Sequence, residues 1–209
     1  MRKVLHIIAS PRNGRSHSRK VANYFIDKLF GVYPDIQLEE LDLELADLPD
    51  FGKPGVFAKY KTGEGLSLDP EEREQWEGAK SVWLHFQSAD AYVFSVPMWN
   101  FSIPHRLKHY IDLVTQNGWA FRVTDTGYEG LMAGKRAFIS FAAGGNYDLP
   151  ETASLDLMRP YMRFWTRFVG LEVFDTINHS TNLDADHDAI FRQCQAQIDE
   201  IIPHFSPEA

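Results

Sequence analysis

The chain has 209 residues, of which 44% are hydrophobic and 13% aromatic, as in a soluble globular protein with one sizeable core. We expect one domain spanning residues 1–209. The formal net charge of −8 disfavours nucleic-acid binding, and no apolar run approaches the ~18 residues of a membrane span, so we expect neither nucleic acid nor a membrane as partner.

The cysteine content and the N-terminus both favour the cytoplasm. Cys194 is the single cysteine, so no internal disulfide forms, which indicates a reducing compartment. The apolar segment 4–9 follows two basic residues, as in a signal peptide, but it is short, contains His6 and is followed at once by Ser10 and Pro11. We therefore interpret this segment as a buried first strand.

Strand-like and helix-like segments alternate along the chain. Residues 3–9 form an apolar run typical of a buried strand, and residues 36–43 alternate with period two, as expected near a sheet edge. Further strands are predicted at 91–96, 136–141 and 171–177. Apolar residues at helical spacing predict helices between these strands, around residues 21–29, 70–86, 103–114, 155–168 and 190–202.

Capping residues indicate where two of these helices start. Asp69 is expected as N-cap with Pro70 at the first helical position, and Ser102 is expected to cap a helix that Pro104 starts. Residues 44–69 contain several glycines and prolines, and they predict an irregular excursion over the surface.

The alternation of elements predicts a fold class. Strands that alternate with helices indicate right-handed βαβ units and a parallel sheet. We expect an α/β, flavodoxin-like fold, with a five-stranded parallel sheet in the order 2-1-3-4-5 and helices on both faces. Its ligand would lie at the carboxyl ends of the first and third strands.

The loop that follows the first strand, residues 10–18, has the composition of a phosphate site. Serine hydroxyls and the free N–H groups of a helix N-terminus bind phosphate, and Arg12 or Arg15 can balance its charge. A plain N-cap by Ser16 or Ser18 is the alternative. Neither G-x-G-x-x-G nor a Walker A motif is present, which argues against a dinucleotide site and a P-loop.

Two further loops follow predicted strands. Residues 97–101 offer a flat aromatic, an amide side chain and free backbone N–H groups, a set that suits a planar heterocycle such as a flavin. Residues 142–146 contain two glycines, which allow the backbone to approach a ligand closely. A structural aromatic turn and an ordinary Gly-Gly turn are the respective alternatives.

Other candidate sites fail on their residue types. His105 and His109 share a helix face, but Arg106 stands where a zinc protease needs glutamate. Residues 184–188 start like a calcium loop but lack its glycine and its bidentate glutamate, so an acidic helix start is the better interpretation. We expect no metal site, and we expect Cys194 to be an inert core residue.

The three loops together resemble the azoreductases, the FMN-dependent NADH:quinone oxidoreductases of the flavodoxin-like superfamily. Shared elements are Ser-Pro-Arg with Ser-x-Ser, Pro-Met-Trp-Asn-Phe-Ser-Ile-Pro, the Phe121-Arg122 segment, Gly130-Leu131-x-x-Gly134-Lys135 and Gly144-Gly145. Departures from the commonest pattern are His17 for Gln, Ala142-Ala143 for Ser-Arg and Tyr147 for His. The absence of serine at 142 removes a hydrogen bond to the flavin, and the changes at 143 and 147 are expected to alter substrate choice.

The resemblance implies where a cofactor and a substrate bind. The implied FMN-binding residues are Ser10, Ser16, His17, Ser18, Pro97, Met98, Trp99, Asn100, Phe101, Ala142, Ala143, Gly144 and Gly145. The implied substrate pocket contains Phe121, Tyr147 and Trp165, and no side chain is expected to act as a catalytic acid or base, since the flavin performs the chemistry.

The resemblance also implies the reaction and the assembly. NADH or NADPH would pass hydride to bound FMN and leave, and a quinone, an azo compound or another flat aromatic acceptor would take its place in a ping-pong cycle. Family members are homodimers. The alternatives that stay open are a flavodoxin-like electron carrier and an FMN-binding module without its own substrate pocket.

Overall fold

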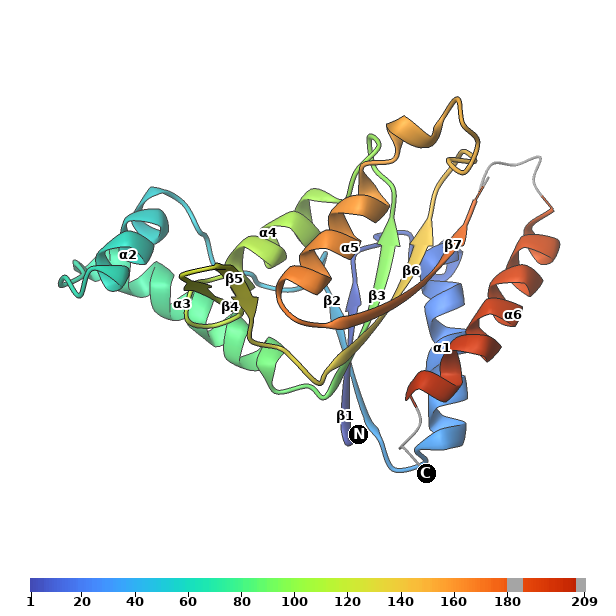
Figure 1. Ribbon diagram of the computed structural model, residues 1–209, viewed down its shortest axis with the longest axis horizontal. Coiled ribbons are helices and arrows are strands. Elements are labelled where there is room, and N and C mark those ends of the chain that lie inside the picture. Colours follow the sequence, from blue (N-terminus) through green and yellow to red (C-terminus); the bar gives the residue numbers. More distant parts are fainter. Residues whose placement is uncertain (180–185, 206–209) are drawn as a thin grey trace.

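The protein is built on a twisted parallel sheet. The structure is a computed structural model, and it describes residues 1–179 and 186–205. Five parallel strands pair in the order β2-β1-β3-β6-β7, which confirms the predicted flavodoxin-like order (Figure 1). These strands are β1 (Lys3–Ile8), β2 (Gln37–Asp42), β3 (Ala91–Pro97), β6 (Arg136–Ala142) and β7 (Glu172–Asn178).

Helices cover both faces of the sheet, as expected. One face carries α1 (His17–Val32) and α6 (His187–Phe205), which lie side by side in Figure 1. The other face carries α3 (Pro70–Gln87), α4 (His105–Val114) and α5 (Met158–Phe168). The three central strands are buried along most of their length and mainly apolar, because side chains on both faces pack against these helices.

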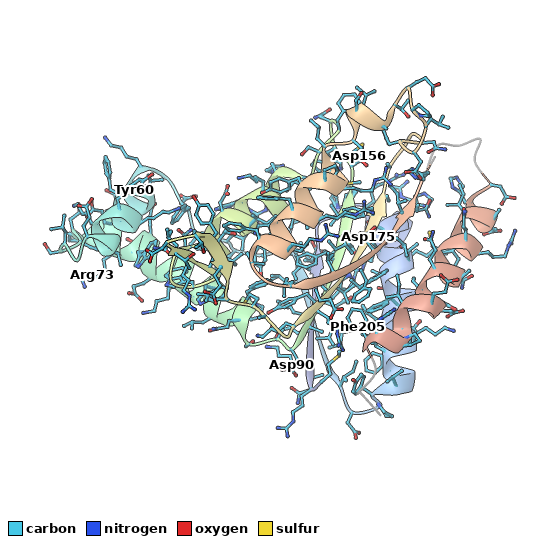
Figure 2. All side chains as sticks on the ribbon, viewed as in Figure 1. Tyr60, Arg73, Asp90, Asp156, Asp175 and Phe205 are labelled. Atoms are coloured by element: carbon cyan, nitrogen blue, oxygen red, sulfur yellow. The ribbon has the colours of Figure 1, made fainter. Side chains whose placement is uncertain are left out.

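Residues 44–69 are not irregular throughout, so that prediction was wrong in part. They contain α2 (Lys53–Gly63), which packs along α3 and lies at one end of the molecule, where Figure 2 labels Tyr60. Gly55 fits closely against Phe51 and Gln75, and Lys61 pairs with the buried Glu72 at 2.6 Å. These tertiary contacts, and not an apolar stripe, stabilise the helix.

The start of α3 confirms the predicted cap, whereas the start of α4 corrects one. Asp69 accepts a hydrogen bond from the N–H of Glu72, and the Glu72 carboxylate accepts one from Asp69 N–H, which forms a capping box. Ser102 does not cap α4. Pro104 is the N-cap without a side-chain hydrogen bond, and Ser102 pairs instead with Trp99 in a tight turn.

A small hairpin precedes β6. It consists of β4 (Phe121–Thr124) and β5 (Gly127–Gly130), and the short helical turns Asn13–Arg15 and Ala153–Leu155 complete the elements. The hairpin packs against the end of α5, where Met132 N–H donates to Val169 O at 2.8 Å. Gly130 lies so close to Gly170 that an added Cβ would stand 2.3 Å from its backbone nitrogen.

A histidine is buried in the middle of the sheet. His6 on β1 is fully buried, with Nε2 2.7 Å from Ser95 Oγ and Nδ1 3.3 Å from Glu40 Oε1. Arg19 also binds Glu40, at 3.0 Å. Burial lowers the pKa of His6 to about 4 against the attraction of Glu40, so the ring is neutral at pH 7.

The residues and the character of the helices bear on three sequence predictions. Cys194 is buried in α6, and burial raises the pKa of its thiol to about 11. Asp186 caps the start of α6, while residues 184 and 185 of the supposed calcium loop lie outside the described residues. Among the helices described, none combines the length and the apolar character that crossing a bilayer requires.

Candidate functional site

The carboxyl ends of β1, β3, β6 and β7 lie at one edge of the sheet, where the loops after β1, β3 and β6 begin. Because the strands are parallel, their carboxyl ends share this edge. Met98 N–H donates to Ala142 O at 2.7 Å, and Ala143 N–H donates to Asn178 O at 3.0 Å. These hydrogen bonds hold the ends of β3, β6 and β7 in fixed register.

A small cavity of about 100 Å³ lies between the first three loops. Ser16 caps α1 by accepting from Arg19 N–H at 3.2 Å, and its hydroxyl lies 3.2 Å from that of Ser18. Both serines and Ser10 are buried. The cavity is lined by Ser10, Arg12, Ser16, His17, Ser18, Pro97, Met98, Trp99, Ala142 and Gly144.

This cavity has the chemistry of a phosphate cradle. The first N–H groups of a helix have no partner within the helix, and the helix dipole adds positive potential there. Arg12 supplies a full charge at the rim. Serine hydroxyls, free N–H groups and a guanidinium together bind a phosphate dianion.

The loop after β3 contains a strained turn. Trp99 and Ser102 exchange two backbone hydrogen bonds of 2.9 and 3.0 Å around Asn100 and Phe101. Both central residues have positive φ, 45° and 68°, as in type I′ turns. Asparagine tolerates this conformation well and phenylalanine poorly, so the turn stores strain of the kind found at functional sites.

Substitutions at Asn100 in this turn are expected to change the free energy of unfolding. Asn100→Ala should lower the free energy of unfolding of the cofactor-free protein by about 1 kcal/mol, because alanine disfavours positive φ. Asn100→Gly, the matched control, should restore most of this loss. Urea denaturation measures both. Equal stability of the two variants would show that the backbone conformation at position 100 carries no such cost.

A second, larger cavity of about 1200 Å³ lies between α2, α4 and α5. Its walls are mainly apolar, and Trp99 borders both this cavity and the small one. Phe164 on α5 is 67% exposed at this surface. Further lining residues are Phe51, Val56, Asn100, His105, His109, Ile111, Thr115, Tyr161, Trp165 and Phe168.

The predicted pocket residues Phe121, Tyr147 and Trp165 occupy different places. Trp165 lines the large cavity and donates from Nε1 to Thr115 Oγ1 at 2.9 Å. Phe121 on the hairpin packs against Phe168 with ring centroids 4.9 Å apart, so it lies behind the cavity wall. Tyr147 packs near Gly145 on the loop after β6. Within one chain, the three side chains do not form a common pocket.

A partly buried ion-pair cluster anchors the loop after β6. Asp156 accepts from the N–H groups of Met158 and Arg159 at the start of α5, where Figure 2 labels it. Arg159 bonds to the carboxylates of Asp156 and Asp148, and His179 bonds to Asp148 at 2.5 Å. The cluster joins α5 to the end of β7 and so fixes the path of the loop.

The other predicted site residues differ in their exposure and in the cavity that they border. Asn100 and Phe101 are exposed on the turn, Gly145 is partly exposed, and the buried Ala143 is hydrogen-bonded toward β7. Arg12 borders the small cavity, whereas Arg15 borders a neighbouring one. Asn178, which sequence reasoning missed, is buried there, and its position at the end of a predicted strand was the available signal.

Comparison with known proteins gives consistent results. A family model described as the flavodoxin-like fold matches residues 2–202. FMN-dependent NADH:quinone oxidoreductase 2 of Pseudomonas syringae pv. tomato is 34% identical, over 98% of this chain and 99% of that protein. FMN-dependent NADH:quinone oxidoreductase 9 of Burkholderia lata is 38% identical, over 82% of this chain and 84% of its own.

Solved structures agree with these relatives. The FMN-dependent NADH-azoreductase of Bacillus anthracis, crystallised in complex with FMN, superposes with a TM-score of 0.87 at 26% identity, covering 99% of this chain and 100% of that one. Another azoreductase structure from Bacillus anthracis gives a TM-score of 0.88 at 27% identity, with 96% and 98% covered. Fold, loop arrangement and sequence similarity together show that the chain belongs to the family of FMN-dependent NADH:quinone oxidoreductases.

Proposed function

We propose that the protein is an FMN-dependent NADH:quinone oxidoreductase that also reduces azo compounds, by two-electron hydride transfer in a ping-pong cycle. The observation that carries this proposal is the cradle of three buried serines between the end of β1 and the start of α1, beside loops with free backbone N–H groups. The names of the relatives supply the reaction class and favour NADH as the co-substrate.

The residues present fit FMN. The cradle offers hydroxyl, N–H and guanidinium donors for the phosphate, and its neighbours Pro97, Met98 and Trp99 provide a flat apolar wall. In the described part of the chain, the backbone N–H groups of Asn100, Phe101, Gly144 and Gly145 make no hydrogen bond to protein. A planar ring with polar edges would satisfy these four donors.

The protein's own contribution is binding, orientation and charge stabilisation. When bound, FMN accepts a hydride from NADH and passes two electrons to the acceptor. Ser10, Ser16 and Ser18 hold its phosphate, and the N–H groups of Gly144 and Gly145 are donors that stabilise negative charge on the ring. The turn at Asn100 and Phe101 holds the other polar edge. We propose that water supplies the protons.

Removing one hydroxyl from the cradle tests the FMN site. Ser18→Ala should weaken FMN binding roughly ten- to hundredfold, because hydrogen bonds to charged groups contribute about 1.5–3 kcal/mol. Fluorescence titration of the cofactor-free protein with FMN measures this loss. Ser140→Ala is the matched control, since Ser140 is a buried serine on β6 whose hydroxyl has no partner among the described residues. Equal FMN affinity in both variants would remove Ser18 from the site.

A second measurement separates the enzyme from an electron carrier. An enzyme is expected to oxidise NADH in the steady state when a quinone is present and no partner protein is added, whereas an electron carrier is not. The purified protein should show flavin absorption that bleaches with NADH without oxygen and returns with a quinone. A colourless protein that does not take up FMN would contradict the proposal.

We further propose a cytoplasmic homodimer. The exposed Phe164 and the neighbouring apolar walls of the large cavity form a surface that a second copy would cover. Phe164→Glu should shift the protein to a monomer in sedimentation experiments. Phe30→Glu, on α1 at the opposite face of the sheet, should leave the dimer intact. A wild-type monomer, or a dimeric Phe164→Glu variant, would reject this surface.

A further inference from the structure

A second cavity adjoins the phosphate cradle at the ends of two helices. Helices α1 and α6 lie side by side on the same face of the sheet, and both start at the carboxyl edge (Figure 1). Their first residues, His17 and His187, have ring centroids 4.8 Å apart. Two helix N-termini therefore direct their positive dipole ends toward the same place.

This cavity has a volume of about 170 Å³ and a basic lining. Since a water molecule in the liquid occupies about 30 Å³, there is room for a tetrahedral oxyanion with its hydration. The described residues that line it are Gly14, Arg15, Ser16, His17, Lys20, Asn178, His187 and Phe191, none of which is acidic. Lys20 is held in place by Phe191, whose ring centroid is 4.1 Å from its Nζ.

Two buried polar groups in this lining have no partner. Asn178 is 2% exposed, and its Oδ1 makes no hydrogen bond in the part of the chain that the structure describes. The same holds for Nδ1 of His187. Burial, followed by the charges of His187, Arg12 and Lys20, lowers the pKa of His17. With its amide turned so that Nδ2 faces the cavity, Asn178 is a donor, and so is His187 with Nδ1 protonated; an oxyanion beside Arg15 and Lys20 would accept hydrogen bonds from both.

We propose that the cavity between the N-termini of α1 and α6 binds a second oxyanion, a free phosphate or a phosphate monoester, beside the FMN cradle. Ser16 and His17 border both cavities, so an anion here would lie next to the flavin phosphate. Lys20 and Arg15 supply its positive partners, and the Asn178 amide and the imidazole of His187 supply neutral N–H donors. This proposal rests on the proposed function only in naming FMN as the ligand of the neighbouring cavity.

The test uses the FMN-loaded protein, so that the cradle is already filled. Inorganic phosphate at constant ionic strength should shift the imidazole NMR signals of His17 and His187 saturably, and chloride should not. Lys20→Gln should weaken this binding roughly fivefold, and Asn178→Asp should abolish it by charge repulsion. Lys28→Gln removes the same charge from the same helix outside the cavity, and it should bind phosphate like the wild type.

The outcomes separate this site from the cradle. Methyl phosphate binding as tightly as phosphate assigns the cavity to a monoester, whereas phosphate binding alone assigns it to the free ion. The proposal would be overturned if phosphate bound only the FMN-free protein, or if it bound Lys20→Gln and Asn178→Asp as tightly as it binds the wild type. Failure of FMN to bind at all would instead contradict the proposed function, and the phosphate titration would still report on this cavity.

Discussion

Gly130→Ala should destabilise the protein by about 3 kcal/mol or more, the largest effect expected from a single methyl group in this chain. The new Cβ would lie 2.3 Å from Gly170 N and 2.4 Å from the carbonyl carbon of Val169. Both atoms belong to backbone at the end of α5, so no side chain can rotate away. The hairpin would have to separate from α5, breaking the bond from Met132 N–H to Val169 O.

Thermal and urea denaturation measure this effect against a matched control. In a chain of this size, a loss of 3 kcal/mol corresponds to a fall in Tm of roughly 6–12 °C. Gly31→Ala adds the same methyl group to α1, where nothing lies within 4 Å of the new Cβ, and should leave stability unchanged or raise it by up to about 1 kcal/mol. If the two variants were equally stable, the contact between hairpin and helix would not be tight.

The free energy of unfolding should fall by about 3 kcal/mol between pH 7 and pH 4 through His6 alone. Its pKa is about 4 in the folded protein, against an ordinary value of 6.5 when unfolded. Between these values the unfolded chain binds a proton that the native chain excludes, so acid favours unfolding. The stability is fully present above pH 6.5 and is lost as the pH falls toward 4, at about 1.4 kcal/mol per pH unit.

His6→Gln isolates this contribution from that of the carboxylates. Glutamine keeps a polar side chain beside Ser95 but does not titrate, so its stability curve should be flatter than that of the wild type between pH 4 and 6.5. Carboxylates such as Asp148, whose pKa is lowered by Arg159 and His179 against burial, contribute equally to both proteins. If the free energies of unfolding of the two proteins changed in parallel across this range, the pKa of His6 would be the same in the folded and the unfolded protein.

Much of the fold was predictable because its elements obey local rules. The central strands are continuous apolar runs, and Asp69 with Pro70 has the composition of a helix start. Helix α2 was missed because its sequence has two glycines, a proline and no apolar stripe, so only its packing on α3 makes it helical. The Ser102 cap was wrong because a tight turn with Trp99 competes for the same residue.

The candidate site was predictable in position more than in detail. Sequence reasoning placed the loops of Ser10, Trp99 and Gly144 together, since parallel strands bring their carboxyl ends to one edge, and all three residues line one cavity. The division of the basic residues between two cavities depends on how α6 packs against α1. This packing cannot be predicted from a local sequence pattern. Asn178 is likewise buried through packing between elements distant in sequence.

The open sheet leaves β2 and β7 at its edges, and this has a consequence for aggregation. Edge strands present unpaired backbone groups to which a second chain can add. Here Glu39 and Glu40 on β2, and Glu172 and Asp175 on β7, form ion pairs with basic side chains of neighbouring elements. An incoming strand would have to desolvate these charges, so the acidic edges should protect the refolding chain at neutral pH and lose this protection in acid.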